Sequence, residues 1–286
     1  MDLNELQQHL NKIMREENTK PRASFQGYSS SEMNHILYDT FGDNSPIQIK
    51  KINDTDYQRI PIFRLVSHLM NILLEQKELK LTQKGYLPVK IVSELYFSND
   101  IEEKYIKVGL NKLNKETDSA HIRLTHILLK ISGLAKKRNN KLSLTNKGKK
   151  ALTDKHELFT IILNAFTKKF NWAYLDGYGE NQIGQLGYGF SLILLSFYGL
   201  KERDVSFYGK KYFEAFPQLL RKITSTYISV QQYAENCYAF RTFEHFMKFF
   251  GLVNLREEGN FWEKKMYVSK AEVFDKLFNI LPPKAI

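Results

Sequence analysis

Seven histidines, one cysteine and scattered carboxylates are the residues of this chain that could bind a metal or catalyse a reaction. His121 and His126 lie on different sides of any helix that contains both, and no His-Glu-x-x-His motif occurs. Cys237 has no second cysteine with which to form a disulfide or a thiolate zinc site. The carboxylates between residues 176 and 204 lack a spacing suited to acid–base catalysis. We therefore expect no metal and no cofactor, and the sequence leans against an enzyme while leaving open one with a dispersed site.

A glycine-rich segment at residues 177–189, "GYGENQIGQLGYG", could contact phosphate through its backbone. It matches neither the G-x-G-x-x-G fingerprint nor the P-loop pattern, and it follows a helical pattern rather than a strand. An aromatic-packed connection between helices explains the segment more simply. Exposed aromatic rings here could instead line a ligand pocket or stack on bases, which would suit a small-molecule sensor. The candidate pocket residues are Trp172, Tyr174, Tyr178 and Tyr188.

Residues 130–152, "KISGLAKKRNNKLSLTNKGKKAL", combine the end of an apolar helical run, a basic turn and a new helical start. The dipeptide Asn139-Asn140 favours a tight turn, so the flanking stretches are predicted to pair as two strands. Lysine and arginine at such a tip can neutralise phosphates and release counterions, and the asparagines can donate to sugar, phosphate or base edges. A solvated hairpin tip needs the same polar composition, and lysines also protect an exposed edge strand. The segment is therefore compatible with nucleic-acid binding and with a purely structural hairpin.

The composition favours a folded, basic protein. The 286 residues include 42 Lys and Arg against 31 Asp and Glu, which gives a net charge of +11. A surplus of this sign attracts polyanions such as nucleic acid. The longest apolar stretch, "GFSLILLSFYGL", is too short to span a membrane, and the N-terminal segment lacks the layout of a signal peptide. We expect a cytoplasmic protein with no membrane partner.

Helical periodicity places the basic tip after three predicted helices, at 88–96, 101–113 and 119–132. Pro88 suits the first turn of the first helix, where its missing N–H group costs little. In the third helix apolar residues share one face, whereas Arg123, His126 and Lys130 share another at positions i, i+3 and i+7. The short repeat "LTQKG" at 81–85 and "LTNKG" at 144–148 follows an apolar helical run in both places. A weaker third copy of the same plan lies near the C-terminus.

Three helices followed by a β-ribbon is the order of a winged helix-turn-helix, and "KLSLTNKGKKAL" resembles the wing-to-helix junction of winged-helix bacterial regulators. The resemblance covers about 88–152 well, and 60–88 and 206–286 more loosely. The whole chain also resembles uncharacterised bacterial proteins built from tandem units of this kind. The resemblance implies a mainly α fold with small β-hairpins, in which tandem winged-helix-like units surround a helical, aromatic-rich middle. The expected regions are 1–87 with a first winged-helix-like unit, 88–153 as the winged helix-turn-helix unit, and 154–286 ending in a third such unit.

In the winged-helix family the third helix enters the major groove and the wing contacts phosphate or the minor groove. The resemblance therefore implies that the third helix presents three groove-facing residues, Arg123, His126 and Lys130, and that the wing presents four phosphate contacts, Lys136, Lys137, Arg138 and Lys141. Between Arg138 and Lys141, the side chains of Asn139 and Asn140 add the hydrogen-bonding capacity described above.

The C-terminal ribbon differs because it contains Glu257, Glu258 and Glu263, and acidic tips repel phosphate. Two main hypotheses follow. The first is a protein that binds nucleic acid, with double-stranded DNA as its partner, and serves in regulation or in mobile DNA. The second is a protein-interaction scaffold whose winged units contact a partner or a second copy without binding DNA.

Overall fold

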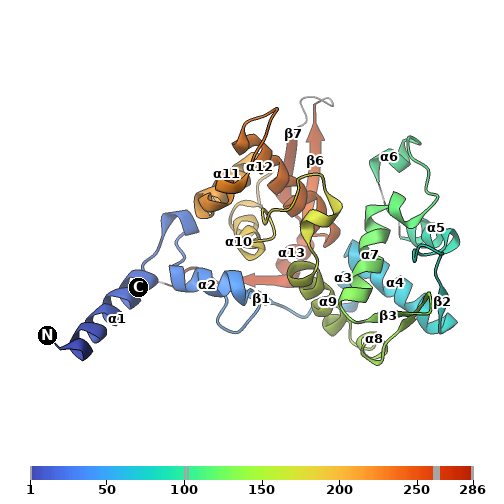
Figure 1. Ribbon diagram of the computed structural model, residues 1–286, viewed down its shortest axis with the longest axis horizontal. Helices are drawn as coiled ribbons and strands as arrows, with labels where there is room; N and C mark the ends of the chain where they lie inside the picture. Colours follow the sequence, from blue (N-terminus) through green and yellow to red (C-terminus); the bar gives the residue numbers. More distant parts are fainter. Residues whose placement is uncertain (1, 100, 102, 260–264, 285–286) are drawn as a thin grey trace. The chain divides into compact units, whose positions relative to one another are not determined.

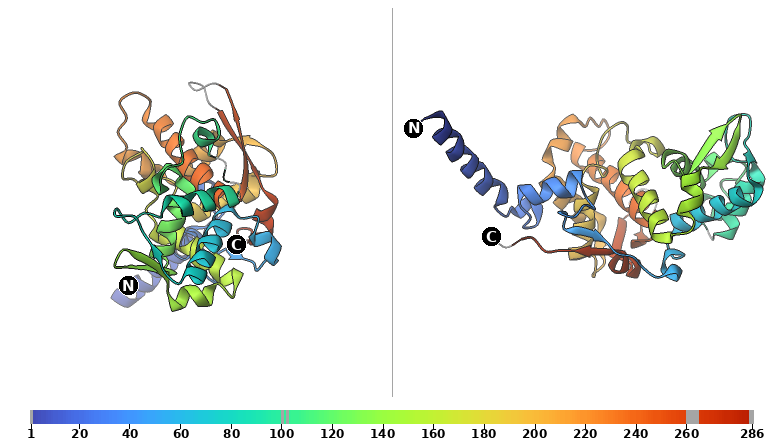
Figure 2. Two further views of the ribbon diagram at one scale, coloured as in Figure 1. Left: turned by 90° about the vertical axis from the view of Figure 1, so that its right-hand side faces the viewer. Right: turned by 90° about the horizontal axis from the view of Figure 1, so that it is seen from below.

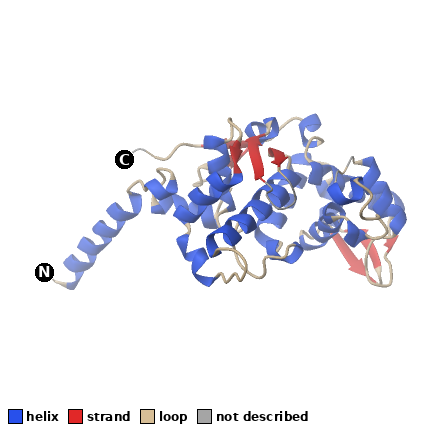
Figure 3. Ribbon diagram, turned by 90° about the horizontal axis from the view of Figure 1, so that it is seen from above, coloured by secondary structure: helices blue, strands red, loops and turns tan. Residues whose placement is uncertain are grey.

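The computed structural model describes residues 2–99, 101, 103–259 and 265–284 (Figure 1). Within these ranges the chain is mainly helical with small antiparallel sheets, which confirms the expected fold class at that level (Figure 3). Two compact units form. The first contains residues 1–50, 178–248 and 252–286, and the second contains 51–177 with 249–251. The units therefore divide the chain differently from the expected regions 1–87, 88–153 and 154–286.

The second unit combines helices with one three-stranded sheet. The sheet has the order β2-β4-β3, so its first strand lies beside its last. Because β2 pairs with β4, the strand that follows α4 belongs to the same sheet as the hairpin of 135–144, so residues 61–80 do not form a unit of their own. The elements are α3 (Asp54–Tyr57), α4 (Pro61–Gln76), β2 (Leu79–Lys80), α5 (Val89–Ser98), α6 (Lys104–Lys107), α7 (Ala120–Ile131), β3 (Ala135–Arg138), β4 (Lys141–Leu144), α8 (Asn146–Ala151) and α9 (Lys155–Asn164).

Local chemistry explains the boundaries of these elements. Pro61 begins α4 at a position where its missing N–H group is not needed. Ser119 caps α7, since its hydroxyl accepts the N–H of Ile122 at 3.3 Å. Asn139 and Asn140 have φ of 48° and 56°, the left-handed pair that a two-residue hairpin requires. The predicted hairpin is thus present, and Figure 2 shows it in light green outside the helices of its unit.

The two copies of the L-T-x-K-G repeat have different roles. Thr145 is the N-cap of α8, and its hydroxyl accepts the N–H of Gly148 at 3.0 Å. Thr82 instead lies in a turn, where its hydroxyl accepts the N–H of Tyr86 at 3.0 Å. Gly85 in that turn has a φ of +82°, which favours glycine. The repeat therefore marks a chain reversal stabilised by a threonine hydroxyl, and only its second copy begins a helix.

The first unit contains a second sheet with the same connectivity. Its order is β5-β7-β6, so the first strand again lies beside the last, and a separate pair joins β1 to β8. The helix that precedes the hairpin ends in a π-helical segment, η6. The elements are α1 (Leu3–Thr19), α2 (Ser30–Tyr38), β1 (Ile47–Ile49), α10 (Tyr188–Tyr198), β5 (Arg203–Asp204), α11 (Val205–Ala215), α12 (Val230–Ala239), η6 (Phe240–Met247), β6 (Val253–Glu258), β7 (Lys265–Lys270), α13 (Glu272–Leu277) and β8 (Phe278–Ile280).

Both units therefore follow the order helix, short strand, two major helices and hairpin. In the second unit the helices are α4, α5 and α7, and in the first they are α10, α11 and α12. No helix among the described residues has both the length and the apolar character needed to cross a membrane.

A buried tyrosine cluster forms part of the core of the first unit. The rings of Tyr212 and Tyr238 stack with centroids 4.3 Å apart, and Tyr208 packs on Phe243. The Tyr212 hydroxyl donates to the carbonyl of Leu186 at 2.5 Å and accepts the N–H of Gly184 at 3.0 Å. The Tyr208 hydroxyl is buried and has no hydrogen-bond partner among the described residues. These two phenols thus differ in hydrogen bonding while sharing one core.

This difference predicts opposite responses to removal of the two hydroxyls. Tyr212→Phe should lower the free energy of unfolding by about 1–3 kcal/mol, because a partly buried carbonyl and a buried N–H group lose their partner. Tyr208→Phe should leave it within about 1 kcal/mol of the wild type or raise it, since no hydrogen bond is lost. Urea unfolding at pH 7 measures both values. An equal loss for the two variants would contradict the assigned hydrogen bonds.

The same cluster predicts a loss of stability in alkali. Burial raises the pKa of Tyr208 to about 12, against about 10 for an exposed tyrosine. The folded state therefore binds this proton more tightly than the unfolded state does, and its contribution to stability is complete below pH 10 and falls as the pH rises towards 12. Compared with the wild type, Tyr208→Phe should gain relative stability across that range. A constant difference in unfolding free energy from pH 9 to 12 would rule this out.

Candidate nucleic-acid interface

The net positive charge of the chain resides almost entirely in the second unit. That unit contains 23 Lys and Arg against 13 Asp and Glu, and so accounts for ten of the eleven net charges. Between residues 119 and 153 there are nine basic residues and no acidic one. This range contains α7, the β3–β4 hairpin and α8. A polyanion would therefore be attracted to this part of the second unit.

The register of the sheet brings cations from all three strands together. Lys80 of β2 lies opposite Lys141 of β4, which lies opposite Arg138 of β3. Opposed residues of an antiparallel pair share one face of a sheet, and Lys136 shares it too because side chains alternate along β3. We call these four exposed residues, Lys80, Lys136, Arg138 and Lys141, the basic sheet face.

Little within the unit neutralises the basic sheet face. The ammonium group of Lys141 lies 2.6 Å from a carboxylate oxygen of Glu78, in a pair that is half exposed. Neither Lys80, Lys136 nor Arg138 forms an ion pair with any residue that the structure describes. Like charges placed directly opposite one another destabilise a sheet. A bound phosphate backbone would relieve this repulsion, which makes the face a candidate site for nucleic acid.

The remaining predicted wing residues do not all join this face. Lys137 lies opposite Leu142, on the other side of the hairpin, and its ammonium group lies beside Gly85. The amide of Asn140 donates to the carbonyls of Leu81 and Thr82 at 3.1 and 2.9 Å, so it tethers the turn to the end of β2. Asn139 is exposed at the tip.

His126 is not groove-facing, contrary to the prediction. Its side chain is 1% exposed, and its Nδ1 lies 2.9 Å from a carboxylate oxygen of Glu116. The same oxygen accepts the N–H of Leu87 at 2.6 Å. The buried face of α7 is wider than the apolar periodicity indicated. Glu116, in the segment before the helix, covers His126 and pairs with its imidazole. His126 and Glu116 therefore tie α7 to the chain that precedes α5.

Arg123 and Lys130 have different surroundings on α7. The guanidinium of Arg123 lies over the ring of Tyr174, 5.0 Å from its centroid, and donates to the tyrosine hydroxyl at 3.2 Å. Lys130 is exposed near the end of the helix. Of the three predicted groove residues, only Lys130 is exposed and without such a contact, so α7 offers little for reading bases.

The four candidate pocket residues do not form one pocket within either unit. Trp172 is buried in the second unit, where its indole N–H donates to the carbonyl of Phe166 at 3.0 Å. Tyr174 is exposed and contacts Arg123, as described above. Tyr178 and Tyr188 belong to the first unit, the former packed on Tyr233 and the latter buried in α10.

A buried arginine that the sequence analysis did not identify organises the glycine-rich segment. The guanidinium of Arg241 donates to the carbonyls of Asn181 and Gly179 at 2.8 and 3.0 Å, and to the side chain of Asn181 at 2.7 Å. These backbone groups are acceptors, whereas phosphate binding requires N–H donors. The segment thus binds a cation of its own chain. A lone arginine in the aromatic run "CYAFRTF" was the only signal of this in the sequence.

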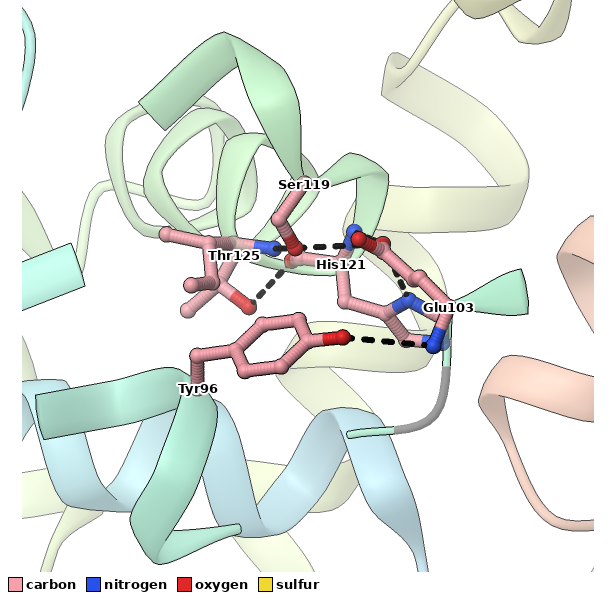
Figure 4. Close-up of polar contacts among 6 residues, drawn as sticks. Tyr96, Glu103, Ser119, His121 and Thr125 are labelled. Carbon is pink, nitrogen blue, oxygen red and sulfur yellow. Dashed lines mark hydrogen bonds and ion pairs between the residues drawn. The ribbon is translucent and has the colours of Figure 1, made fainter. Parts of the chain in front are cut away.

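Ser119, His121 and Glu103 lie together at the start of α7 (Figure 4). A serine, a histidine and an acid could form a nucleophilic triad, but here both polar residues donate to the same oxygen of Glu103. The Ser119 hydroxyl does so at 3.1 Å, the His121 N–H at 3.2 Å and the imidazole Nδ1 at 2.8 Å. Glu103 therefore lies at the N-terminus of α7, where the helix dipole favours a carboxylate. The cluster anchors the helix and does not activate the serine.

Comparison with known proteins gives one partial similarity. Residues 58–157 match the family model of the Y4jL N-terminal domain. The matched range lies inside the second unit and includes its whole sheet together with α4, α5, α7 and α8. Comparisons with curated proteins and with solved structures found no match.

The buried position of His126 predicts a structural role. His126→Ala should lower the free energy of unfolding by about 2–4 kcal/mol, because it leaves a cavity and deprives the buried Glu116 of a partner. Lys130→Ala, one helical turn away, should change it by less than about 0.5 kcal/mol because Lys130 is exposed. Urea unfolding of both variants tests this contrast. Equal stability of His126→Ala and wild type would contradict the buried pair.

Proposed function

We propose that the second unit binds double-stranded DNA through phosphate contacts made by the basic sheet face. The observation that carries this proposal is the row formed by Lys80, Lys141 and Arg138, three cations directly opposite one another with Glu78 as the one acid paired to them among the described residues. Release of counterions from DNA would supply the binding free energy. The ten net positive charges of the unit would steer the duplex towards it.

The connectivity of the second unit supports a winged-helix assignment as part of this proposal. A helix, a short strand, two helices and a hairpin, with the first strand beside the last, is the arrangement expected of a winged helix-turn-helix. In this assignment α5 and α7 form the helix-turn-helix, and β3 and β4 form the wing. The similarity to the Y4jL N-terminal domain covers these elements but names no ligand.

The contacts of α7 favour backbone binding over base reading. His126 is buried and Arg123 is engaged by Tyr174, so Lys130 is the one predicted groove residue that remains exposed and without such a contact. Base readout in the major groove needs several polar side chains that can reach base edges. We therefore infer that the unit contacts phosphates along the duplex and shows little preference for sequence.

A protein-interaction role is the second candidate, and a specific observation favours it for the first unit. That unit repeats the connectivity of the second but has almost no net charge. On the described part of its hairpin the guanidinium of Arg256 is paired with Glu202 and Glu258, in contrast to Lys80, Lys136 and Arg138 of the basic sheet face. Glu263, also expected on this tip, lies outside the described residues. We propose that the first unit contacts protein rather than nucleic acid.

Charge removal on the basic sheet face tests DNA binding. A fluorescence titration of the full chain with a 20-base-pair duplex should give a dissociation constant that rises with salt. The triple variant Lys80→Ala, Lys136→Ala, Arg138→Ala should bind more weakly, and the slope of log K against log salt should become shallower by roughly 2–3 because about 0.9 counterions are released per phosphate neutralised.

The matched control removes three exposed cations from the first unit, in the variant Lys210→Ala, Arg221→Ala, Lys222→Ala. It changes the net charge by the same amount and should retain the wild-type slope within error. Equal effects of the two triple variants would assign binding to net charge alone. Absence of binding at low salt would contradict the proposal altogether.

A further inference from the structure

Helix α1 presents an apolar stripe that no described residue of its own unit covers. Leu3, Leu6, Leu10 and Ile13 follow one another at spacings of three, four and three residues, which places them on one side of the helix. We call these four residues the α1 stripe. Leu3 is 86% exposed, and the other three are between 43 and 45% exposed. Figure 2 shows α1, in dark blue, leading away from α2 with no other element of its unit beside it.

The helix is well formed despite this exposure. Asp2 accepts the N–H of Glu5 at 2.7 Å and Glu5 accepts the N–H of Asp2 at 2.9 Å, which is a complete capping box. No residue of α1 is buried, so packing against the described residues of its unit does not account for its apolar side. A short helix gains most of its stability from burying such a side. The α1 stripe is therefore a surface that lacks its partner within the unit.

We propose that the α1 stripe of one chain packs against the α1 stripe of a second copy in an antiparallel pair. The spacing of three and four residues is that of a coiled-coil seam, and a patch repeated on both copies can close a dimer through a two-fold axis. With Leu3 opposite Ile13 and Leu6 opposite Leu10 of the other copy, four apolar layers form.

The charges of α1 favour this occupant over a polyanion. The helix contains Glu5, Glu16 and Glu17 against Lys12 and Arg15, whereas helices that bind acidic membranes are rich in lysine and arginine on the polar side. An acidic membrane surface or nucleic acid would therefore gain little attraction from α1. A second copy of this helix is nearly neutral as well, so little charge repulsion opposes its approach.

Glu17 favours the antiparallel orientation. It occupies the position that continues the α1 stripe after Ile13, four residues further along the helix. In a parallel pair two Glu17 side chains would face each other in one layer, and like charges in contact are unfavourable. In the antiparallel register each Glu17 lies beyond the last apolar layer, so the two Glu17 side chains are at opposite ends of the pair and do not face each other.

The contact is small, and we expect a weak dimer. Four layers along a helix of about 25 Å lie near the lower limit of about 1,000 Å² for a specific interface. Sedimentation equilibrium of the full chain between about 1 and 200 μM should show the mean mass rising from one chain towards two. The double variant Leu6→Glu, Leu10→Glu should weaken the dimer at least about tenfold and remain monomeric across this range.

The matched control is Asn4→Glu, Gln8→Glu, which adds the same two charges at the same spacing on the polar side of α1. It should dimerise like the wild type, and thermal unfolding of both variants should match the wild type since α1 buries no residue. A wild-type mass of one chain throughout the range would overturn the proposal. Equal dissociation of the control and the stripe variant would do the same.

Cysteine cross-linking tests the orientation. In a Cys237→Ser background, an equimolar mixture of Leu6→Cys and Leu10→Cys chains should form mainly the mixed disulfide-linked dimer under mild oxidation. Preferential formation of the two like-with-like dimers would indicate a parallel pair and would overturn the antiparallel assignment.

Discussion

The pairing of β2 with β4 is the contact on which the surface of the second unit depends. Leu79 opposite Leu142 buries the inner side of this short ladder, and the next pair places Lys80 beside Lys141 on the outer side. A shift of one residue would exchange these two sides, so burial of the leucines specifies the row of cations. The amide of Asn140 secures the same register by bonding to carbonyls just beyond β2. The pairing of β2 with β4, two segments about sixty residues apart, thus determines both the burial of the leucines and the position of the cations.

The two units use one connectivity with different polar chemistry. In the second unit the hairpin cations lack acidic partners apart from Glu78, whereas in the first unit Arg256 is matched by two glutamates among the described residues. The helix before each hairpin also differs, because α7 contains His126 paired with Glu116 and η6 contains Arg241 bound to backbone carbonyls. A shared order of elements therefore does not imply a shared partner.

Local signals in the sequence predicted part of the local structure, although the helix expected at 101–113 is present, among the described residues, only as α6 (Lys104–Lys107). The Asn139-Asn140 turn and the helix of α7 are present because each depends on residues within a few positions.

What the sequence could not give were the contacts between distant segments. Strand β2 has two residues, too few for a periodic pattern, so Lys80 was missed as a member of the site. His126 was placed on the polar side of α7 because nothing in the helix itself indicates that Glu116 covers it. The carbonyls that bind Arg241 come from a segment about sixty residues earlier in the chain.

Amine footprinting of the lysines in the presence and absence of duplex DNA tests the central claim most directly. The claim is that nucleic acid binds on the outer face of the β2-β4-β3 sheet. It predicts that DNA reduces the acetylation rate of Lys80, Lys136 and Lys141, and leaves the rates of exposed lysines of the first unit such as Lys210 and Lys222 unchanged. Protection centred on the first unit, or no protection of these three lysines while DNA is bound, would contradict it.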